Sequence, residues 1–388
     1  MSIKGKAYIA GAFEHPTRRA ETQSVAQLHA ECAKGALEDA GLSIRDVDGY
    51  FCAGDAPGLG GLGLADYMGI QPTHIDSTET GGSSYLIHAS HAAQAIATGK
   101  CNVALITLAG RPRSEGSRGT VPRFYGSTAP DSPYEVPFNP VTVNLYALAA
   151  QRHMHEFGTT KEQLAWVKVA ASHHAQHNPN AFLRTVLSIE DVLNSPYVAD
   201  PLHRMDCCVV TDGGGAIVVV RPEIALSLKR PLVKILGAGE AVKNPQGGKL
   251  DLTYSAAVKS GPIAFSEAGV TPSDIKYASI YDSFTITVIM QLEDLGFCKK
   301  GEGGRFVQDG NLISGIGSLP WNTDGGGLCN NHPANRGGIT KIIEAVRQLR
   351  GEAHPAVQVK NCDLALAHGT GGSLGHRHGS ATLILERS

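Results

Sequence analysis

The residues best suited to chemistry in this chain are two histidines and a tyrosine that stand where apolar segments end. His332 lies in an Asn-Asn-His-Pro turn, Tyr281 follows an apolar strand, and His368 closes the apolar run DLALAH. An imidazole or a phenol can give or take a proton, so each is a candidate general acid or base. Each also has an inert alternative: a loop histidine held by backbone groups, a tyrosine that fills the core, or a histidine that is only hydrogen-bonded. Asp282, beside Tyr281, either acts with it or caps the following helix.

Metal chemistry has weaker support. Histidines gather in two clusters, His173-His174-His177 and His376-Arg377-His378. No acidic residue or cysteine accompanies either cluster, which favours solvated surface over a metal site. The eight cysteines contain no CxxC spacing, so we expect neither a structural zinc site nor any other bound metal.

Composition narrows the class of protein. A chain of 388 residues with 42% hydrophobic content can bury two joined cores, because single cores stop growing near ~250 to 300 residues. The 34 basic and 36 acidic residues nearly cancel and form no blocks, which argues against nucleic acid and anionic membranes as partners. Small molecules and other proteins remain.

The cysteine content and the amino-terminal residues point to a cytoplasmic setting. Eight cysteines are too sparse for a disulfide scaffold, and the adjacent Cys207 and Cys208 are an unlikely pair to bridge each other. The opening residues MSIKGKAYIAGAF predict a short strand rather than a signal peptide, and no segment approaches the ~20 apolar residues that span a bilayer.

One stretch of the sequence occurs twice. ALEDAGLSIRDVDGYF, from Ala36, returns as AFSEAGVTPSDIKYAS, from Ala264, with Gly41 matching Gly269. Each copy predicts a helix with a glycine C-cap, then a polar turn and a strand. Similar strands precede both copies, and a glycine-led apolar strand closes each half, which indicates duplication of a whole domain.

The elements that position the candidate residues alternate between strands and helices, which predicts α/β layers around a mostly parallel sheet. We place the halves at residues 1–225 and 226–388. Residues of about 111–204 have no counterpart in the second half; they contain proline-rich loops and two helical stretches, and we interpret them as an insertion that caps the site.

Several motifs resemble the thiolase superfamily over nearly the whole chain. HRMDCCVVTDGGGAIVVV is similar to the segment that closes the family's first half. WNTDGGGLCNNHPANRGG resembles the loop of its catalytic histidine, here His332. IYDSFTI occupies the place of the family's NEAF loop, and HGTGGSLGH resembles its carboxyl-terminal glycine-rich loop. YDSFTITVIMQLEDLGFCKKGEGG and SPYVADPLHRMDCC are closest to sterol-carrier-protein-type thiolases and their bacterial lipid-transfer-protein-like relatives.

This resemblance implies a thiolase fold, with two duplicated halves in a five-layer α-β-α-β-α arrangement and an inserted cap. It also implies an acyl-CoA substrate, no permanently bound cofactor beyond the coenzyme A of that substrate, and a homodimer. A small zinc-ribbon and OB-fold protein is the further partner expected from the subgroup.

Counting back from Ile96, the nucleophilic cysteine of thiolases falls on Gly82. A thiolase needs a thiolate to hold the acyl group, and glycine cannot supply one. Ser83 or Ser84 would need an adjacent base to act instead, and capping of the following helix is the simpler role for both.

Retro-aldol cleavage of a β-hydroxyacyl-CoA needs no nucleophile, only a base for the β-hydroxyl and donors for the enolate. The resemblance assigns His332 to the oxyanion hole and Tyr281, which replaces an asparagine, to acid–base work, with His368 in support. A base role for Tyr281 requires a pKa well below the ordinary ~10 of a phenol. Gly82, Ser83, Asn331, Gly371 and Gly372 are the expected supporting residues. A thiolase or acyltransferase with another nucleophile, or a non-catalytic subunit of a complex, are the alternatives.

Overall fold

The computed structural model covers the chain and describes residues 2–53, 56–116, 134, 141–244, 249–333, 337–375 and 377–388. The first part contains β1 (Tyr8–Glu14), α1 (Val25–Ala40), β2 (Gly49–Phe51), α2 (Gly61–Met68), β3 (His74–Asp76), α3 (Ser84–Ala97), β4 (Val103–Gly110), β7 (Gly213–Val220) and α8 (Pro222–Ala225). The second part contains β8 (Val233–Lys243), α9 (Ala257–Ala268), β9 (Tyr277–Ile280), α10 (Thr285–Asp294), α11 (Gly303–Phe306), α12 (Gly326–Cys329), α13 (Gly338–Arg350), β10 (Leu364–Gly372) and β11 (His378–Arg387).

The described strands of these two parts form one sheet in the order β3-β2-β4-β7-β1-β8-β11-β10-β9. The order β2-β4-β7-β1 is mirrored by β9-β10-β11-β8, with the same relative strand directions in both sets. Only two residue pairs of β1 and β8, Tyr8 with Lys234 and Ile9 with Val233, join the sets in register. Such a repeat of order and direction is what a duplication predicts, while the boundary at residues 225 and 226 stays a prediction.

The repeated stretch has the predicted local structure in both copies. The helices α1 and α9 end at Gly41 and Gly269, whose φ angles of 72° and 73° lie in the left-handed region that favours glycine. A short 3-10 turn follows each glycine, at Ile44–Asp46 and Pro272–Asp274, and leads into β2 and β9. The two copies therefore deliver their strands to equivalent places in the sheet.

The expectation of a mostly parallel sheet is wrong. Only β2 with β3, β2 with β4, and β9 with β10 pair in parallel among the described strands. The glycine-led strands that close the halves, β7 and β11, run antiparallel to both of their neighbours. Nearly all residues of both strands are buried, and burial does not determine strand direction.

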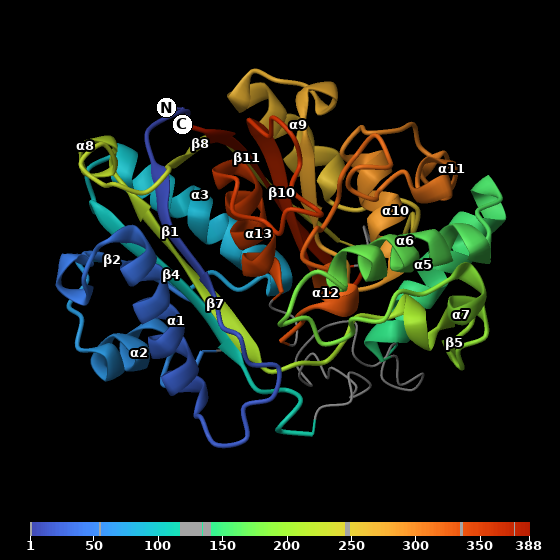
Figure 1. Cartoon of the computed structure of the whole chain (residues 1–388), viewed down its shortest axis with the longest axis horizontal. Helices are drawn as coiled ribbons and strands as arrows, with labels where there is room; N and C mark the ends of the chain where they lie inside the picture. Colours follow the sequence, from blue (N-terminus) through green and yellow to red (C-terminus); the bar gives the residue numbers. More distant parts are fainter. Residues whose placement is uncertain are drawn as a thin grey trace.

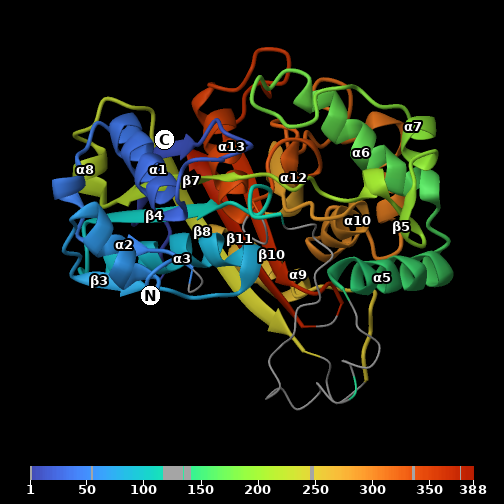
Figure 2. The ribbon, with the colours of Figure 1, turned by 90° about the horizontal axis from the view of Figure 1, so that it is seen from below.

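Helices complete the layers. Figures 1 and 2 show α3 and α13 between the two parts of the sheet, and α1 and α9 pack on the two outer faces. The polypeptide is thus layered α-β-α-β-α, as expected. The first turns of α3 and α13 lie beside β10 at the centre of the molecule.

The described part of the insertion consists of α5 (Thr142–Phe157), α6 (Lys161–Ala175), α7 (Ile189–Leu193), β5 (Tyr197–Ala199) and β6 (Leu202–His203). The two predicted helical stretches are therefore present, and they pack beside α10 and α12 (Figure 2). Residues 117–133 and 135–140, which include the proline-rich loop, lie outside the described residues. The role of the insertion as a cap remains a prediction.

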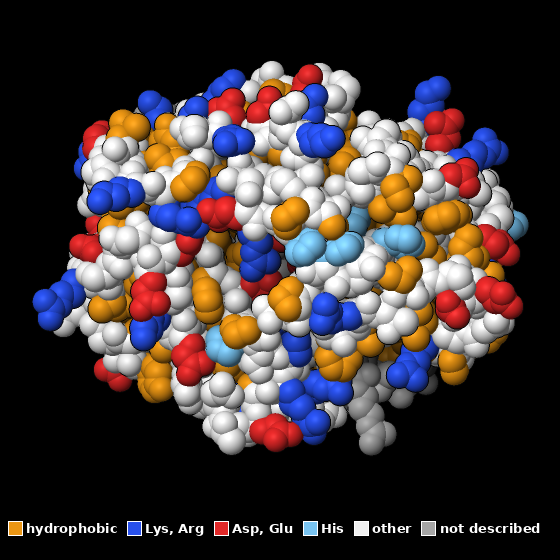
Figure 3. Space-filling model, in the orientation of Figure 1, with side chains coloured by type: hydrophobic (Ala, Val, Ile, Leu, Met, Phe, Trp, Pro, Cys, Tyr) orange, Lys and Arg blue, Asp and Glu red, His pale blue; other side chains and the backbone are white. Residues whose placement is uncertain are grey.

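The cysteines, the helices and the surface charges can be compared with what the composition predicted. All eight cysteines are free thiols. Across the described residues, no helix is both long and apolar enough to cross a bilayer. Figure 3 shows basic and acidic side chains interspersed over one face of the molecule, in keeping with its balanced charge.

Candidate active site

The structure brings Tyr281 and His332 together. Tyr281 directly follows β9, and its phenol oxygen lies 2.9 Å from His332 Nε2. The two rings meet edge to face, with centroids 5.5 Å apart, and both side chains are buried. A buried phenol hydrogen-bonded to an imidazole can move a proton between the two groups. The sequence assigned acid–base work to Tyr281 and the oxyanion hole to His332, and both roles stay predictions.

Asp282 holds the loop of His332 in place. Its carboxylate accepts hydrogen bonds from the backbone N–H groups of Gly327 (2.8 Å) and Leu328 (3.0 Å) at the start of α12. Lys341 pairs with the same carboxylate at 2.8 Å. The helix that follows Asp282, α10, has no side-chain cap, so the capping alternative is wrong. The residue next to Tyr281 instead fixes the turn that leads to His332.

Gly82 faces the ring of Tyr281. It lies in the 3-10 turn Gly81–Ser83, which leads into α3. A Cβ atom on Gly82 would lie 2.6 Å from Tyr281 Cζ and would also overlap the carbonyl oxygen of Thr370. The phenol ring thus fills the space that a side chain at residue 82 would need, so a cysteine at residue 82 and Tyr281 in this position exclude each other.

The predicted capping by the two serines after Gly82 is wrong. Ser83 Oγ donates to the carbonyl and hydroxyl oxygens of Thr80 (2.9 and 3.0 Å), and Ser84 Oγ accepts from the Thr80 N–H (2.8 Å). Both hydroxyls therefore stabilise the turn before the helix, whose own N–H groups they do not cap. Neither bonds to a histidine or carboxylate in these contacts, so activation as a nucleophile has no support.

His368 is not brought to the pair. Its Nδ1 lies 2.8 Å from Thr382 Oγ1, which in turn bonds Ser260 of the outer helix α9 at 3.0 Å. Its neighbour Gly369 faces the opposite layer, where a Cβ would approach Ser83. Since successive side chains of a strand point to opposite faces, His368 points away from Tyr281. Burial, together with His378, lowers the pKa of His368 to about 3.

Gly371 and Gly372 allow β10 to approach the turn before α3. A Cβ on Gly371 would overlap the carbonyl oxygen of Thr80, and Gly372 has a left-handed φ of 81°. The close approach is thus between two backbone segments. A contact of either glycine with a thioester stays a prediction.

Sequence reasoning did not predict that Tyr146 of α5 contacts the end of β10. Its hydroxyl donates to the carbonyl oxygen of Gly372 at 3.3 Å, and its ring lies 4.3 Å from that of Phe284. An aromatic residue in a helix of the insertion offers no sequence signal for this place, because the packing of the insertion on the second half sets it.

Arginines of the insertion are candidates to bind the phosphates of coenzyme A, and two of them have structural partners. Arg111 donates to the carbonyl oxygens of Ala20 and Glu21, and Arg113 donates to Val210 and stacks over Phe182 at 4.4 Å. Two further candidates, Arg118 and Arg123, lie outside the described residues.

No metal-binding cluster of three or more histidine, cysteine or acidic side chains occurs among the described residues. His177 stacks on His354, with ring centroids 5.0 Å apart, while His376 lies outside the described residues.

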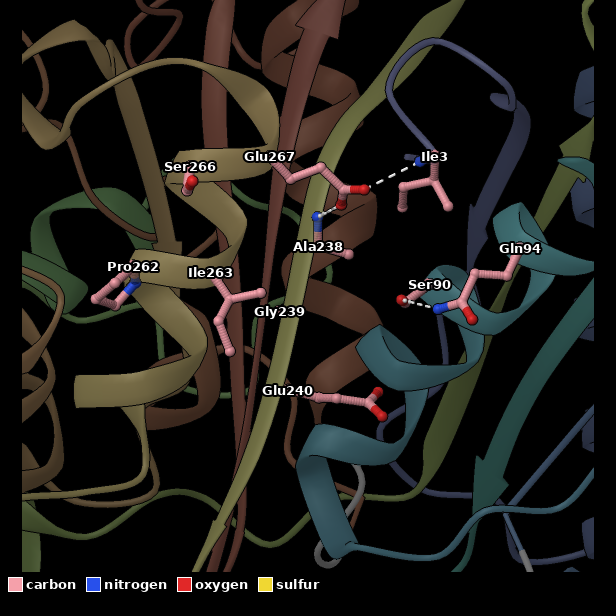
Figure 4. Close-up of a pocket in the computed structure, with 10 residues that line it drawn as sticks. All are labelled: Ile3, Ser90, Gln94, Ala238, Gly239, Glu240, Pro262, Ile263, Ser266 and Glu267. Atoms are coloured by element: carbon pink, nitrogen blue, oxygen red, sulfur yellow. Dashed lines mark hydrogen bonds between the residues drawn. The ribbon is translucent and has the colours of Figure 1, made fainter. Parts of the chain in front are cut away.

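An open groove lies elsewhere, between α3, β8 and α9 (Figure 4). Its lining includes Gln94, Glu240 and Ile263, but neither residue of the Tyr281–His332 pair. The carboxylate of Glu267, at its rim, accepts hydrogen bonds from the backbone N–H groups of Ile3 and Ala238, each at 3.0 Å. The groove is therefore separate from the candidate active site.

Comparison with known proteins agrees with this fold. A family model described as Thiolase C-terminal domain-like matches residues 239–387. The chain is 36% identical to a steroid side-chain-cleaving aldolase of Thermomonospora curvata, covering 90% of this chain and 91% of the relative. It is 34% identical to a 17-hydroxy-3-oxo-4-pregnene-20-carboxyl-CoA lyase of Mycobacterium tuberculosis, covering 95% and 97%. It is also 33% identical to an acetyl-CoA acetyltransferase of Methanothermobacter thermautotrophicus, covering 89% and 91%.

Solved structures give the same result. The Ltp2-ChsH2(DUF35) aldolase superposes with a TM-score of 0.89 at 32% identity, over 99% of this chain and 98% of that one. Human mitochondrial 3-ketoacyl-CoA thiolase, at 14% identity and a TM-score of 0.71, shows the shared fold alone. The chain belongs to the thiolase superfamily, within the subgroup that contains the thiolase-fold aldolases. The predicted class, an acyl-CoA carbon–carbon lyase of the aldolase type, is confirmed at this level.

Proposed function

We propose that this protein cleaves a β-hydroxyacyl-CoA by a retro-aldol reaction in which Tyr281 and His332 move the proton. The observation that carries the proposal is that the Tyr281 ring fills the side-chain space of Gly82 while its hydroxyl bonds His332. In a thiolase, the residue at position 82 would hold the covalent acyl group. In this protein, the phenol of Tyr281, an acid–base group, fills the space of that side chain. One relative is named as a steroid side-chain-cleaving aldolase and another as a 17-hydroxy-3-oxo-4-pregnene-20-carboxyl-CoA lyase, and both names suggest a bulky acyl group here.

In the proposed reaction, Tyr281 takes the proton of the β-hydroxyl group as His332 Nε2 accepts the phenol proton. The Cα–Cβ bond breaks, the β-carbon leaves as an aldehyde or ketone, and the bonding electrons become the thioester enolate. His332 then returns the proton through Tyr281 to Cα, which yields the shortened acyl-CoA. The reaction is redox-neutral and leaves both side chains as they began.

Acyl transfer is the alternative, because acetyl-CoA acetyltransferases are among the relatives. The cysteines argue against it. Burial raises the pKa of every thiol in the chain, including the two nearest to Gly82 in sequence, to about 11 for Cys52 and about 12 for Cys101. A thiol is a nucleophile only as its thiolate, and a raised pKa keeps these thiols protonated at neutral pH.

Incubation of the pure protein with β-hydroxyacyl-CoA and β-ketoacyl-CoA substrates tests the reaction. We expect an aldehyde or ketone from the β-hydroxy substrates without added coenzyme A. Cleavage of β-keto substrates that requires free coenzyme A, and that is lost in Ser83→Ala, would instead establish a thiolase. Binding of the CoA esters without turnover, alone or with its partner, would support the non-catalytic subunit.

We also propose a homodimer. The edge strand β3 and the adjacent α2 expose Leu62, Tyr67 and Ile75 by more than half. An exposed edge strand with apolar neighbours is a surface that a second copy can cover. Sedimentation should give a dimer, and Ile75→Lys should shift it toward monomer; a monomeric wild-type protein would contradict the proposal.

A DUF35 protein is the further partner that we propose, because the similar solved aldolase is named with one. This corresponds to the small zinc-ribbon and OB-fold partner expected from the sequence. Co-expression with such a protein from the neighbouring genes, followed by co-purification, tests the assembly. In keeping with the free cysteines, we place the complex in the cytoplasm.

A further inference from the structure

Glu14, the last residue of β1, is a buried carboxylate that reaches the loop of His332 from the other half of the chain. Its Oε1 accepts hydrogen bonds from the side-chain amides of Asn330 and Asn331, each at 3.1 Å. Arg18 donates to the same oxygen at 2.7 Å, and Arg347 donates to Oε2 at 3.2 Å. The carboxylate thus binds both residues that immediately precede His332.

A chain of three hydrogen bonds leads from Glu14 to the backbone of His332. Asn331 donates to Glu14 through Nδ2 and accepts through Oδ1 from the hydroxyl of Thr211, at 2.7 Å. Thr211 Oγ1 in turn accepts the backbone N–H of His332 at 2.8 Å. Asn331 and Thr211, the two middle members of the chain, each bond one partner on either side.

The charge of Glu14 sets the direction of this chain. An ionised carboxylate can only accept hydrogen bonds, so Asn331 must present its NH₂ group to Glu14 and its oxygen to Thr211. The Thr211 hydroxyl must then donate to Asn331, which leaves its lone pair for the N–H of His332. Burial raises the pKa of Glu14, but Arg18, Arg347 and the hydrogen bond from Asn331 together hold it below its ordinary value, so the carboxylate stays charged.

We propose that Glu14 is a positioning residue that holds His332 against Tyr281 through Asn331 and Thr211. It does not touch the substrate in this proposal, which rests on the proposed function of the Tyr281–His332 pair. Because β1 belongs to the first half and His332 to the second, the chain of hydrogen bonds makes the active site depend on how the two halves are joined.

Glu14→Gln and Thr211→Val, singly and together, test the proposal. Gln retains the shape of Glu14 but not its charge, and Val retains the shape of Thr211 but not its hydrogen bonds. Each should lower kcat about 10- to 100-fold, because small displacements of a reacting group are costly, with KM for the acyl-CoA little changed. If both act through one chain, the double variant should lose no more than the worse single variant.

Glu344→Gln is the matched control. Glu344 is also a buried carboxylate paired with Arg347, at 3.3 Å, but it bonds Thr323 rather than Asn330 or Asn331, the two residues that precede His332. Its kcat should stay near wild type. Losses that multiply in the double variant, or a Glu14→Gln protein that is less stable yet retains its kcat, would overturn the proposal.

Hydrogen exchange of the peptide 326–333 separates this proposal from the proposed function. Its amide protons should exchange faster in Glu14→Gln and Thr211→Val than in the wild type and Glu344→Gln, whatever reaction the enzyme catalyses. Unchanged exchange in both variants would overturn the positioning role even if retro-aldol activity is confirmed. Faster exchange in a protein without that activity would refute the reaction and leave the ordering of the loop established.

Discussion

The two faces of strands β9 and β10 carry polar side chains in opposite surroundings. On the central face, Tyr281 meets His332 beside Gly82 and the first turn of α3. On the outer face, His368 bonds Thr382 beneath α9 and stays neutral, because burial lowers its pKa to about 3. Both faces are buried, so burial alone does not distinguish a reactive group from a structural one. The difference is that glycines and a separate loop converge on the central face, whereas a helix seals the outer one.

The largest effect should come from Tyr281→Phe, which removes one oxygen from the central face. We expect kcat for β-hydroxyacyl-CoA cleavage to fall about 100- to 10,000-fold, because the acid–base group is lost while the ring remains in place. Product release followed by chromatography measures it, with the thermal unfolding midpoint as the control for folding. Nearly unchanged turnover would assign the chemistry to another group.

The same substitution on the two histidines compares the faces directly. His332→Asn should lower kcat about 100-fold, since it removes the Nε2 partner of Tyr281. His368→Asn retains a polar atom close to the position of Nδ1, so we expect turnover near wild type and a stability loss of about 1–3 kcal/mol. Steady-state kinetics and urea unfolding measure the two effects. A large kcat loss in His368→Asn would restore the catalytic role that the sequence predicted for it.

Gly82→Ala tests the exclusion between residue 82 and the phenol. The added Cβ should displace the Tyr281 ring and lower kcat about 10- to 100-fold. Gly82→Cys should lose activity likewise and gain no coenzyme A-dependent thiolysis, because the carbonyl oxygen of Thr370 also overlaps the added Cβ. Gly61→Ala is the control, because a Cβ there makes only ordinary contacts of 3.6 and 3.8 Å. Thiolase activity in the single Gly82→Cys variant would show that a cysteine at residue 82 and the Tyr281 ring can coexist.

The smallest effect concerns acid stability. Burial lowers the pKa of both His368 and His378 to about 3, below the ~6.5 of an unfolded histidine. Between these values the unfolded chain binds more protons, so the free energy of unfolding should fall as the pH drops from ~6.5 toward ~3. His378→Gln should flatten this slope by up to ~1.4 kcal/mol per pH unit, measured by urea unfolding. An unchanged slope would mean that His378 titrates normally.

The sequence by itself determined the family, the repeated helix–glycine–strand unit, the glycine in place of the nucleophile, and the choice of Tyr281 and His332 as candidate residues. These depend on motifs and on glycines whose backbone angles only that residue adopts readily. The sequence also predicted that successive side chains of a strand point to opposite faces. It did not predict which layer each face contacts.

Only the tertiary structure decided the rest. The register of β9 against β10 turned His368 toward α9. The antiparallel direction of β7 and β11 is not encoded in the residues of these two buried strands. A side chain on Gly82 would overlap the ring of Tyr281, 199 residues further along the chain, and the carbonyl oxygen of Thr370. Glu14 reaches Asn331, beside His332, across a still longer separation. Contacts between residues so far apart in sequence depend on how the two halves pack, and no local pattern records that packing.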